Sequence, residues 1–96
     1  MEILVTYDVS TADSAGRRRL RRVAKVCEGY GQRVQQSVFE CVVNPGEYEL
    51  LKHRLEQEID PAQDSLRFYR LQAPRERYLL TMGQEPEFDI REPLVL

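Results

Sequence analysis

The first eight residues of the chain alternate in a way that predicts a β-strand with two largely apolar faces. Ile3, Val5 and Tyr7 fall on one face of this strand. Leu4 and Thr6 fall on the other face. Such a strand is typical of the centre of a sheet, where both faces are covered. We therefore expect this segment to form a central strand around which the rest of the chain packs.

Asp8 directly follows these residues, so the strand ends with a carboxylate. The carboxyl ends of central strands often carry the chemistry of open α/β sheets. Aspartate also commonly begins a loop, which here would span residues 9–13. Position alone leaves both roles of Asp8 open.

Apolar residues recur with helical spacing in the segment from Ser14 to Glu28. They occupy positions i, i+3, i+4 and i+7, which form one stripe: Leu20, Val23, Ala24 and Cys27. Asp13 or Ser14 can cap the start of this helix, and Gly29 and Gly31 end it. The segment is predicted to be an amphipathic helix that packs on a core.

A second helix and three more strands are predicted farther along the chain. The helix begins at Asn44, where a cap residue, a proline and a glutamate follow the order of a helix start, and it continues to about Ile59. Alternating residues predict strands over 32–43, 65–72 and 78–82.

These elements favour an α+β protein of the ferredoxin-like class, with the order β-α-β-β-α-β. In that topology the first and third strands form the central pair, so Asp8 is expected beside the third strand. The second and fourth strands are edges and are free to pair across a dimer. We expect one domain over residues 1–83, followed by a short C-terminal strand or tail over residues 84–96.

The size and composition of the chain indicate a small soluble domain. With 96 residues its core is limited, and a dimer partner would help to stabilise it. The sequence has no apolar run of about 18 residues and no basic leader, so we expect a cytoplasmic protein without membrane contact. Cys27 and Cys41 lack the spacing of a metal site and are expected to be buried, reduced thiols.

The net charge of −2 hides an asymmetry along the chain. Residues 1–36 carry seven cations against four acids, whereas residues 84–96 carry four acids against one cation. Six of the nine residues 17–25 are cations, with no acid among them: Arg17, Arg18, Arg19, Arg21, Arg22 and Lys25. Solvated helices usually mix both signs, so this run favours a track for nucleic-acid phosphates. A plain solvated face is the alternative.

The single histidine, His53, excludes several classes of chemistry. A Ser-His-Asp or Cys-His site needs a base within reach, and His53 lies in the middle of a predicted helix. Histidine-rich zinc sites and glycine-rich phosphate loops are also excluded. A carboxylate with arginines remains, which fits Mg²⁺ or plain anion binding. Because Mg²⁺ commonly uses one or two carboxylates, a site on Asp8 calls for the Asp8 of a second copy and hence a homodimer.

Several stretches of the chain resemble the family of CRISPR-associated protein 2. The resemblance covers about residues 1–82. It rests on Tyr7-Asp8-Val9, the arginine-rich first helix, YGQRVQQSVFE at residues 30–40 and DSLRFYRL at residues 64–71. The stretch G-x-R-V-Q-x-S-V-F-E is its most specific part.

The resemblance implies a homodimer of ferredoxin-like subunits that acts in CRISPR adaptive immunity during spacer acquisition, beside the CRISPR-associated integrase. It also implies a metal-dependent endonuclease for single-stranded RNA or double-stranded DNA, in which Asp8 binds Mg²⁺ or Mn²⁺ across the dimer. The residues that flank this site and affect cleavage would be Tyr7, Arg17, Arg19, Arg33 and Phe39. The register of loop 10–16 against the family is open, so Arg18 or Arg21 can take the place of Arg17 or Arg19.

Three functions stay open at this point. The first is the metal-dependent endonuclease with Asp8 at its centre. The second is a non-catalytic scaffold that bridges integrase subunits and presents the arginine helix to duplex DNA. In both, the tail over 84–96 would cross to the partner subunit or contact the integrase. The third is a toxin-type mRNA interferase of the same fold.

Overall fold

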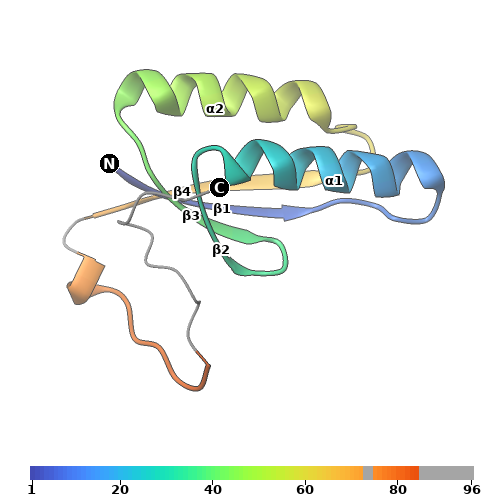
Figure 1. The fold of residues 1–96 in the computed structure, drawn as a ribbon. Helices are drawn as coiled ribbons and strands as arrows, with labels where there is room; N and C mark the ends of the chain where they lie inside the picture. Colours follow the sequence, from blue (N-terminus) through green and yellow to red (C-terminus); the bar gives the residue numbers. More distant parts are fainter. Residues whose placement is uncertain (73–74, 85–96) are drawn as a thin grey trace.

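The computed structural model describes residues 1–72 and 75–84, which form a four-stranded sheet with two α-helices on one face (Figure 1). The elements are β1 (Glu2–Asp8), α1 (Ser14–Glu28), β2 (Gly31–Gln35), β3 (Val38–Val42), α2 (Pro45–Glu58), β4 (Ser65–Leu71) and a short 3-10 helix (Arg75–Arg77). The strands lie in the order β2-β3-β1-β4, and each neighbouring pair is antiparallel. The predicted ferredoxin-like α+β class is confirmed. Within the described residues, no helix has the length and apolar character that a membrane span requires.

The segment 32–43 is a hairpin of β2 and β3, so the prediction of one long strand is wrong. Gln36 and Ser37 form its turn. A register shift after Arg33 marks a bulge in β2 next to this turn. The turn contains none of the Gly, Asn or Asp residues that usually mark a tight hairpin, and alternation continues on both sides of it. The alternation of residues therefore gives no indication that the chain reverses direction here.

The hairpin changes which strands lie beside β1. β3 takes the central place next to β1, and β4, which covers most of the predicted segment 65–72, lies on the other side. Residues 78–82 form a turn and irregular structure, so the prediction of a strand there is wrong. Asp8 pairs with Ser65 of β4, whereas the pairing of β1 with β3 ends at Thr6. Asp8 therefore lies beside the strand over 65–72, as expected, but this strand is an edge of the sheet and not part of its central pair.

The core lies between the sheet and the two α-helices. Its fully buried residues come from both layers: Ile3, Val5, Val23, Cys27, Phe39, Cys41, Leu51 and Leu55. The apolar stripe predicted for α1 therefore faces the sheet as expected. Burial raises the pKa of the Cys27 and Cys41 thiols to about 12. Both cysteines are free and buried, which confirms the prediction of reduced thiols.

The helices leave the other face of the sheet uncovered. On β1, Leu4 and Thr6 point to this face and are only half-buried. The described segment 75–84 lies on this side of the sheet (Figure 1). The Tyr78 hydroxyl donates a hydrogen bond to the Glu2 carboxylate. The sequence predicted that both faces of β1 are covered, but only the face toward the helices is fully covered.

Both α-helices begin as their sequences predict. The Asp13 side chain accepts a hydrogen bond from the backbone N–H of Gly16 at 2.7 Å. Asn44 and Glu47 exchange side-chain to backbone hydrogen bonds of 2.8 and 2.9 Å, which form a capping box. A Cβ atom at Gly16 would collide with the carbonyl oxygen of Ser10. Glycine therefore lets the first turn of α1 contact the loop that follows β1.

Candidate functional site

Asp8 is the last residue of β1, and its side chain is exposed. Because side chains alternate along a strand, Asp8 shares the helix-free face of the sheet with Thr6. Its partner in the register of β4 is Ser65, the first residue of that strand. The carboxylate thus lies at the end of a central strand, as the sequence suggested, and the structure places it on the open face of the sheet.

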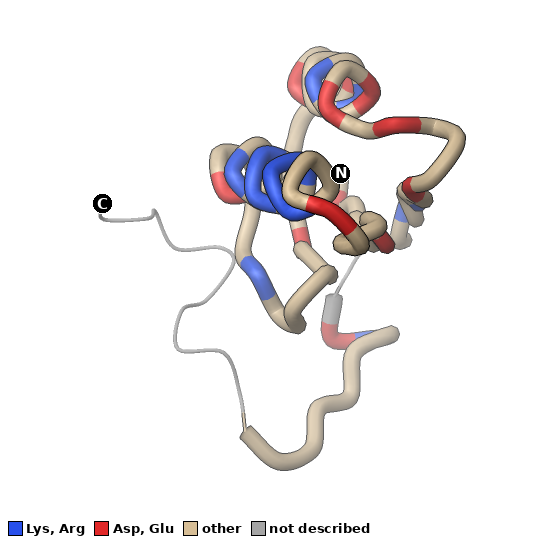
Figure 2. The backbone as a smooth tube through the Cα atoms, turned by 90° about the vertical axis from the view of Figure 1, so that its right-hand side faces the viewer, with Lys and Arg blue, Asp and Glu red and all other residues tan. Residues whose placement is uncertain are grey.

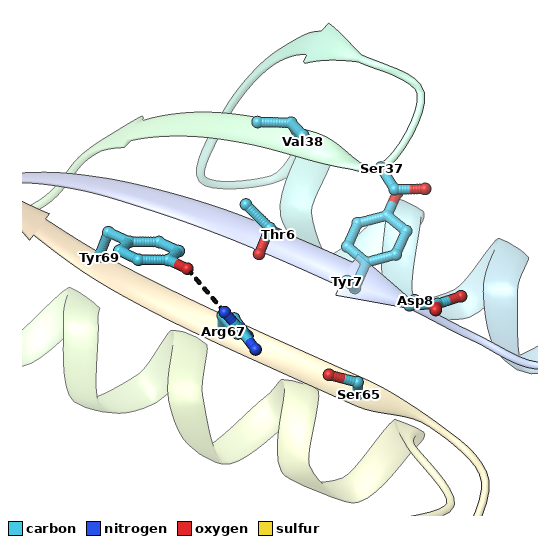
Figure 3. A pocket seen from close by; sticks show the side chains of 8 residues that line it. All are labelled: Thr6, Tyr7, Asp8, Ser37, Val38, Ser65, Arg67 and Tyr69. Atoms are coloured by element: carbon cyan, nitrogen blue, oxygen red, sulfur yellow. Dashed lines mark hydrogen bonds between the residues drawn. The ribbon is translucent and has the colours of Figure 1, made fainter.

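A shallow pocket of about 380 Å³ surrounds this carboxylate. Its lining residues, called the Asp8 pocket below, are Thr6, Tyr7, Asp8, Ser37, Val38, Ser65, Arg67 and Tyr69. Figure 3 shows that Asp8 and Ser65 lie at the same end of neighbouring strands, with Arg67 farther along β4. The pocket therefore combines one carboxylate, several hydroxyls and one guanidinium, which is a suitable environment for a phosphate group.

Tyr7 lines the Asp8 pocket but belongs mostly to the core, since only 6% of its surface is exposed. Its ring stacks on Phe39 with centroids 6.2 Å apart, and its hydroxyl donates to the carbonyl oxygen of Gln36 at 3.4 Å. Burial raises the pKa of Tyr7, and this effect exceeds the opposing influence of Arg33. The hydroxyl is therefore protonated at neutral pH and acts as a hydrogen-bond donor.

Phe39 and Arg33 are neighbours of Tyr7 and do not line the pocket. Phe39 is fully buried in the core. The Arg33 guanidinium carbon lies 5.1 Å from the centre of the Phe39 ring, and Arg33 Nη2 lies 4.0 Å from Glu28 Oε1. The structure thus brings Tyr7, Arg33 and Phe39 into one stack, of which only Tyr7 reaches Asp8's pocket. A role of Phe39 in cleavage remains a prediction, and it would have to act through its neighbours.

The arginines of α1 form a separate surface. Figure 2 shows basic residues along this helix. The four exposed arginines are Arg17, Arg18, Arg21 and Arg22. Arg17 Nη1 donates to the carbonyl oxygen of Thr11 at 3.4 Å. None of these four lines the Asp8 pocket, so a phosphate track on α1 would be distinct from the chemistry at Asp8.

Arg19 differs from the other arginines of α1 because it is paired with Asp64. Its Nε and Nη2 atoms donate to the two Asp64 carboxylate oxygens at 2.8 and 3.3 Å. The Asp64 carboxylate is fully buried and also accepts from the backbone N–H groups of Ser10 and Asp60, at 3.1 and 2.8 Å. These bonds join α1 and the loop after β1 to the residue that precedes Ser65.

The Asp64 contacts determine the charge of that carboxyl group. Burial alone would raise the pKa of Asp64, but the hydrogen bonds from Arg19, Asp60 and Ser10 outweigh it and hold the pKa below its usual value. Asp64 was not among the residues that the sequence singled out. An ion pair between residues 45 positions apart has no local pattern that would reveal it.

The residues around Asp8 fit a hard divalent cation only in part. Within the described residues, no cluster of three or more His, Cys, Asp or Glu side chains could enclose a metal ion. Mg²⁺ needs fewer protein ligands, because it commonly takes one or two carboxylates and keeps several waters. One chain therefore offers half of such a site, a single exposed carboxylate beside the Ser65 hydroxyl.

The fold and the site define a class of protein: a small ferredoxin-like domain with an exposed carboxylate at the end of its central strand and, on a separate surface, an arginine-rich helix. Residues 1–78 match the sequence model of the family described as CRISPR associated protein Cas2. The chain belongs to this family.

Individual relatives agree with this assignment. The chain is 56% identical over 96 residues to a protein of Moorella thermoacetica named CRISPR-associated endoribonuclease Cas2 1, with all of both chains covered. It is 46% identical over 95 residues to the CRISPR-associated endonuclease Cas2 of Halalkalibacterium halodurans, with 99% of each covered. The crystal structure of Streptococcus pyogenes Cas2 at pH 6.5 is similar, with a TM-score of 0.78 and 58% identity over 86% of this chain and 100% of that one.

Proposed function

We propose that this protein is an endonuclease of CRISPR adaptive immunity that hydrolyses phosphodiester bonds beside Asp8. The observation that carries the proposal is the exposed Asp8 carboxylate in a pocket of hydroxyls and one guanidinium. The names of the relatives, endoribonuclease and endonuclease, support this type of reaction. The substrate class is single-stranded RNA or double-stranded DNA, the place of action is the cytoplasm, and the process is spacer acquisition.

The active form in this proposal is a homodimer. Each chain supplies one Asp8, and a two-fold axis that crosses the helix-free face of the sheet would bring two copies of it together. Val42 and Tyr69 support this arrangement, since they are 47% and 43% exposed on that same face. Exposed apolar side chains on an open sheet face favour cover by a second copy. The tail over 84–96, of which residues 85–96 lie outside the described part, would cross to the partner subunit or contact the integrase.

Asp8 from each subunit would hold Mg²⁺ or Mn²⁺ in this dimer. A bound divalent cation would lower the pKa of an attacking water and stabilise charge on the phosphate. The chain's own contributions are to place the two carboxylates, to surround them with the Thr6 and Ser65 hydroxyls, and to keep Tyr7 as a protonated donor nearby.

The decisive experiment compares wild type with Asp8→Ala on matched RNA and DNA substrates, in Mg²⁺, Mn²⁺ and EDTA. We expect Asp8→Ala and EDTA each to slow cleavage by on the order of a hundredfold or more. Glu56→Gln is the matched control, because it changes an exposed carboxylate on α2 that lies outside the Asp8 pocket. Cleavage that survives both Asp8→Ala and EDTA would refute the proposal.

A second function, as a non-catalytic DNA scaffold for the integrase, is favoured by the four exposed arginines on one helix. Such a surface would hold the backbone of duplex DNA through phosphate contacts and would bind with strong dependence on salt. The two functions are compatible in one protein. They separate by experiment because the first depends on Asp8 and the second on α1.

A further inference from the structure

The Asp8 pocket contains a cation that the sequence did not single out. Among its described lining residues, Arg67 is the one cationic side chain. Arg33, which the sequence placed at this site, lies over the Phe39 ring. Arg19 is held by Asp64. The positive charge beside Asp8 therefore comes from β4 and not from the arginines expected there.

The register of β1 and β4 explains this placement. Asp8 is opposite Ser65, and Thr6 is opposite Arg67. Residues two apart on a strand share a face, so Arg67 is the diagonal neighbour of Asp8 on the helix-free face. Diagonal neighbours in an antiparallel pair lie about 7–8 Å apart. That separation leaves room for a phosphate group between a carboxylate and a guanidinium.

The Arg67 side chain is held in place without being neutralised. Its Nη1 atom donates to the Tyr69 hydroxyl at 3.2 Å (Figure 3). The Tyr69 hydroxyl accepts one of the five N–H groups of the guanidinium, so four further N–H donors remain. Within the described residues, Arg67 forms no ion pair with Asp8 or with another acid. Its charge and its remaining donors are therefore available to an anion.

We propose that Arg67 is a catalytic residue that binds the phosphate group of the nucleic acid undergoing cleavage beside Asp8, and that Tyr69 is a positioning residue for its guanidinium. The planar guanidinium can donate two parallel hydrogen bonds to phosphate oxygens. It lies where negative charge develops during hydrolysis, and a donor fixed there stabilises the transition state. This inference rests on the proposed endonuclease function and names the phosphate-binding residue of the same site.

The test combines cleavage with binding for Arg67→Ala, Arg67→Lys and Tyr69→Phe. Cleavage of single-stranded RNA is measured in Mg²⁺ under single-turnover conditions. Binding of a fluorescent RNA of the same sequence is measured in EDTA by anisotropy, as a function of salt. Arg70→Ala is the matched control, since it removes an exposed arginine from the same strand but from outside the pocket.

We expect Arg67→Ala to slow cleavage by roughly 100-fold, as the loss of one fixed donor to a developing oxyanion does. We also expect the slope of log K against log salt for RNA binding by this variant to decrease in magnitude by about 0.7, the value for one phosphate contact to a single strand. Arg67→Lys should keep the salt dependence but not the rate, because it keeps the charge and loses the paired donors. Tyr69→Phe should slow cleavage less than Arg67→Ala does, and Arg70→Ala should behave as wild type.

The inference fails if Arg67→Ala matches wild type in both rate and salt dependence, or if Arg67→Lys restores the full rate. It also fails if Arg67→Ala changes the oligomeric state measured by light scattering, since the residue would then serve an interface. Asp8→Ala in the same series separates this failure from that of the proposed function. If Asp8→Ala is inactive while Arg67→Ala is fully active, only the role of Arg67 is refuted. If Asp8→Ala cleaves as wild type, the endonuclease proposal itself is refuted.

Discussion

Replacing Phe39 by alanine tests whether this residue supports the fold or the chemistry. The ring is fully buried between the sheet and the helices. It stacks on Tyr7 and lies beneath the Arg33 guanidinium. Truncating a buried phenylalanine to alanine removes apolar contacts and leaves a cavity, at a cost of about 3–5 kcal/mol. A domain of this size has a free energy of unfolding of about 5–15 kcal/mol, so the loss is a large fraction of the total.

The assay is urea unfolding followed by far-ultraviolet circular dichroism, at one fixed protein concentration because a dimer would add its own stability. We expect the free energy of unfolding of Phe39→Ala to fall by about 3–5 kcal/mol, and its midpoint temperature by roughly 12–40 °C. Phe39→Leu keeps most of the volume and should cost less than about 1.5 kcal/mol. Arg33→Ala removes the cation above the ring without making a cavity and should cost about 0.5–1 kcal/mol.

Cleavage assays on the same variants decide between the two roles. If Phe39 acts through the fold, Phe39→Leu keeps nearly full activity, and the loss in Phe39→Ala follows the fraction of unfolded protein. The reasoning is refuted if Phe39→Leu is as stable as expected yet loses about a hundredfold in rate, a factor that corresponds to about 2.7 kcal/mol. The phenyl ring would then contribute directly to the site.

Two further predictions concern α1 and the Asp64 ion pair. Replacing Arg18, Arg21 and Arg22 together by glutamate should reduce the slope of log K against log salt for duplex-DNA binding by roughly 3. The control Arg54→Glu on α2 should leave this slope unchanged. Equal effects of the two changes would contradict a phosphate track on α1. Because the folded pKa of Asp64 is held below its unfolded value, the stability that it contributes is present above about pH 4 and is lost as the pH falls through the folded pKa. The free energies of unfolding of wild type and Asp64→Asn, measured in urea, should therefore differ at pH 7 and converge in acid. A difference that stays constant down to pH 2 would contradict a stabilising role of the ionised Asp64 carboxylate.

The local elements could be predicted because their signals lie within a few residues of one another. The bounds of α1, from Ser14 to Glu28, follow from its apolar stripe and its Asp13 cap. The start of α2 follows from the capping box at Asn44. The two buried cysteines follow from their apolar surroundings and their spacing. These are short-range properties, and the tertiary structure leaves them as the sequence predicts.

The strand assignments failed where alternation cannot distinguish two outcomes. One bent strand and a hairpin over 32–43 have the same period of two, and the turn at Gln36 and Ser37 carries no glycine to separate them. Residues 78–82 have a strand-like composition, but strand formation also requires a partner edge, and β-propensity is weak without one. The predicted class of fold was nevertheless correct, because the segment 32–43 forms two strands in place of one, and this makes up for the missing strand at 78–82.

By itself the sequence determined the helices, the central apolar strand, the Asp8 carboxylate at its end and the excess of arginine on α1. The tertiary structure alone decided what each arginine does. The register of β1 and β4 makes Arg67 the diagonal neighbour of Asp8. The ion pair with Asp64, 45 residues away in sequence, engages the Arg19 side chain, unlike the exposed arginines of α1. Phe39 is buried in the core and does not line the site. The physical reason is that these relations depend on strand pairing and on contacts between distant segments, which no local pattern of residues encodes.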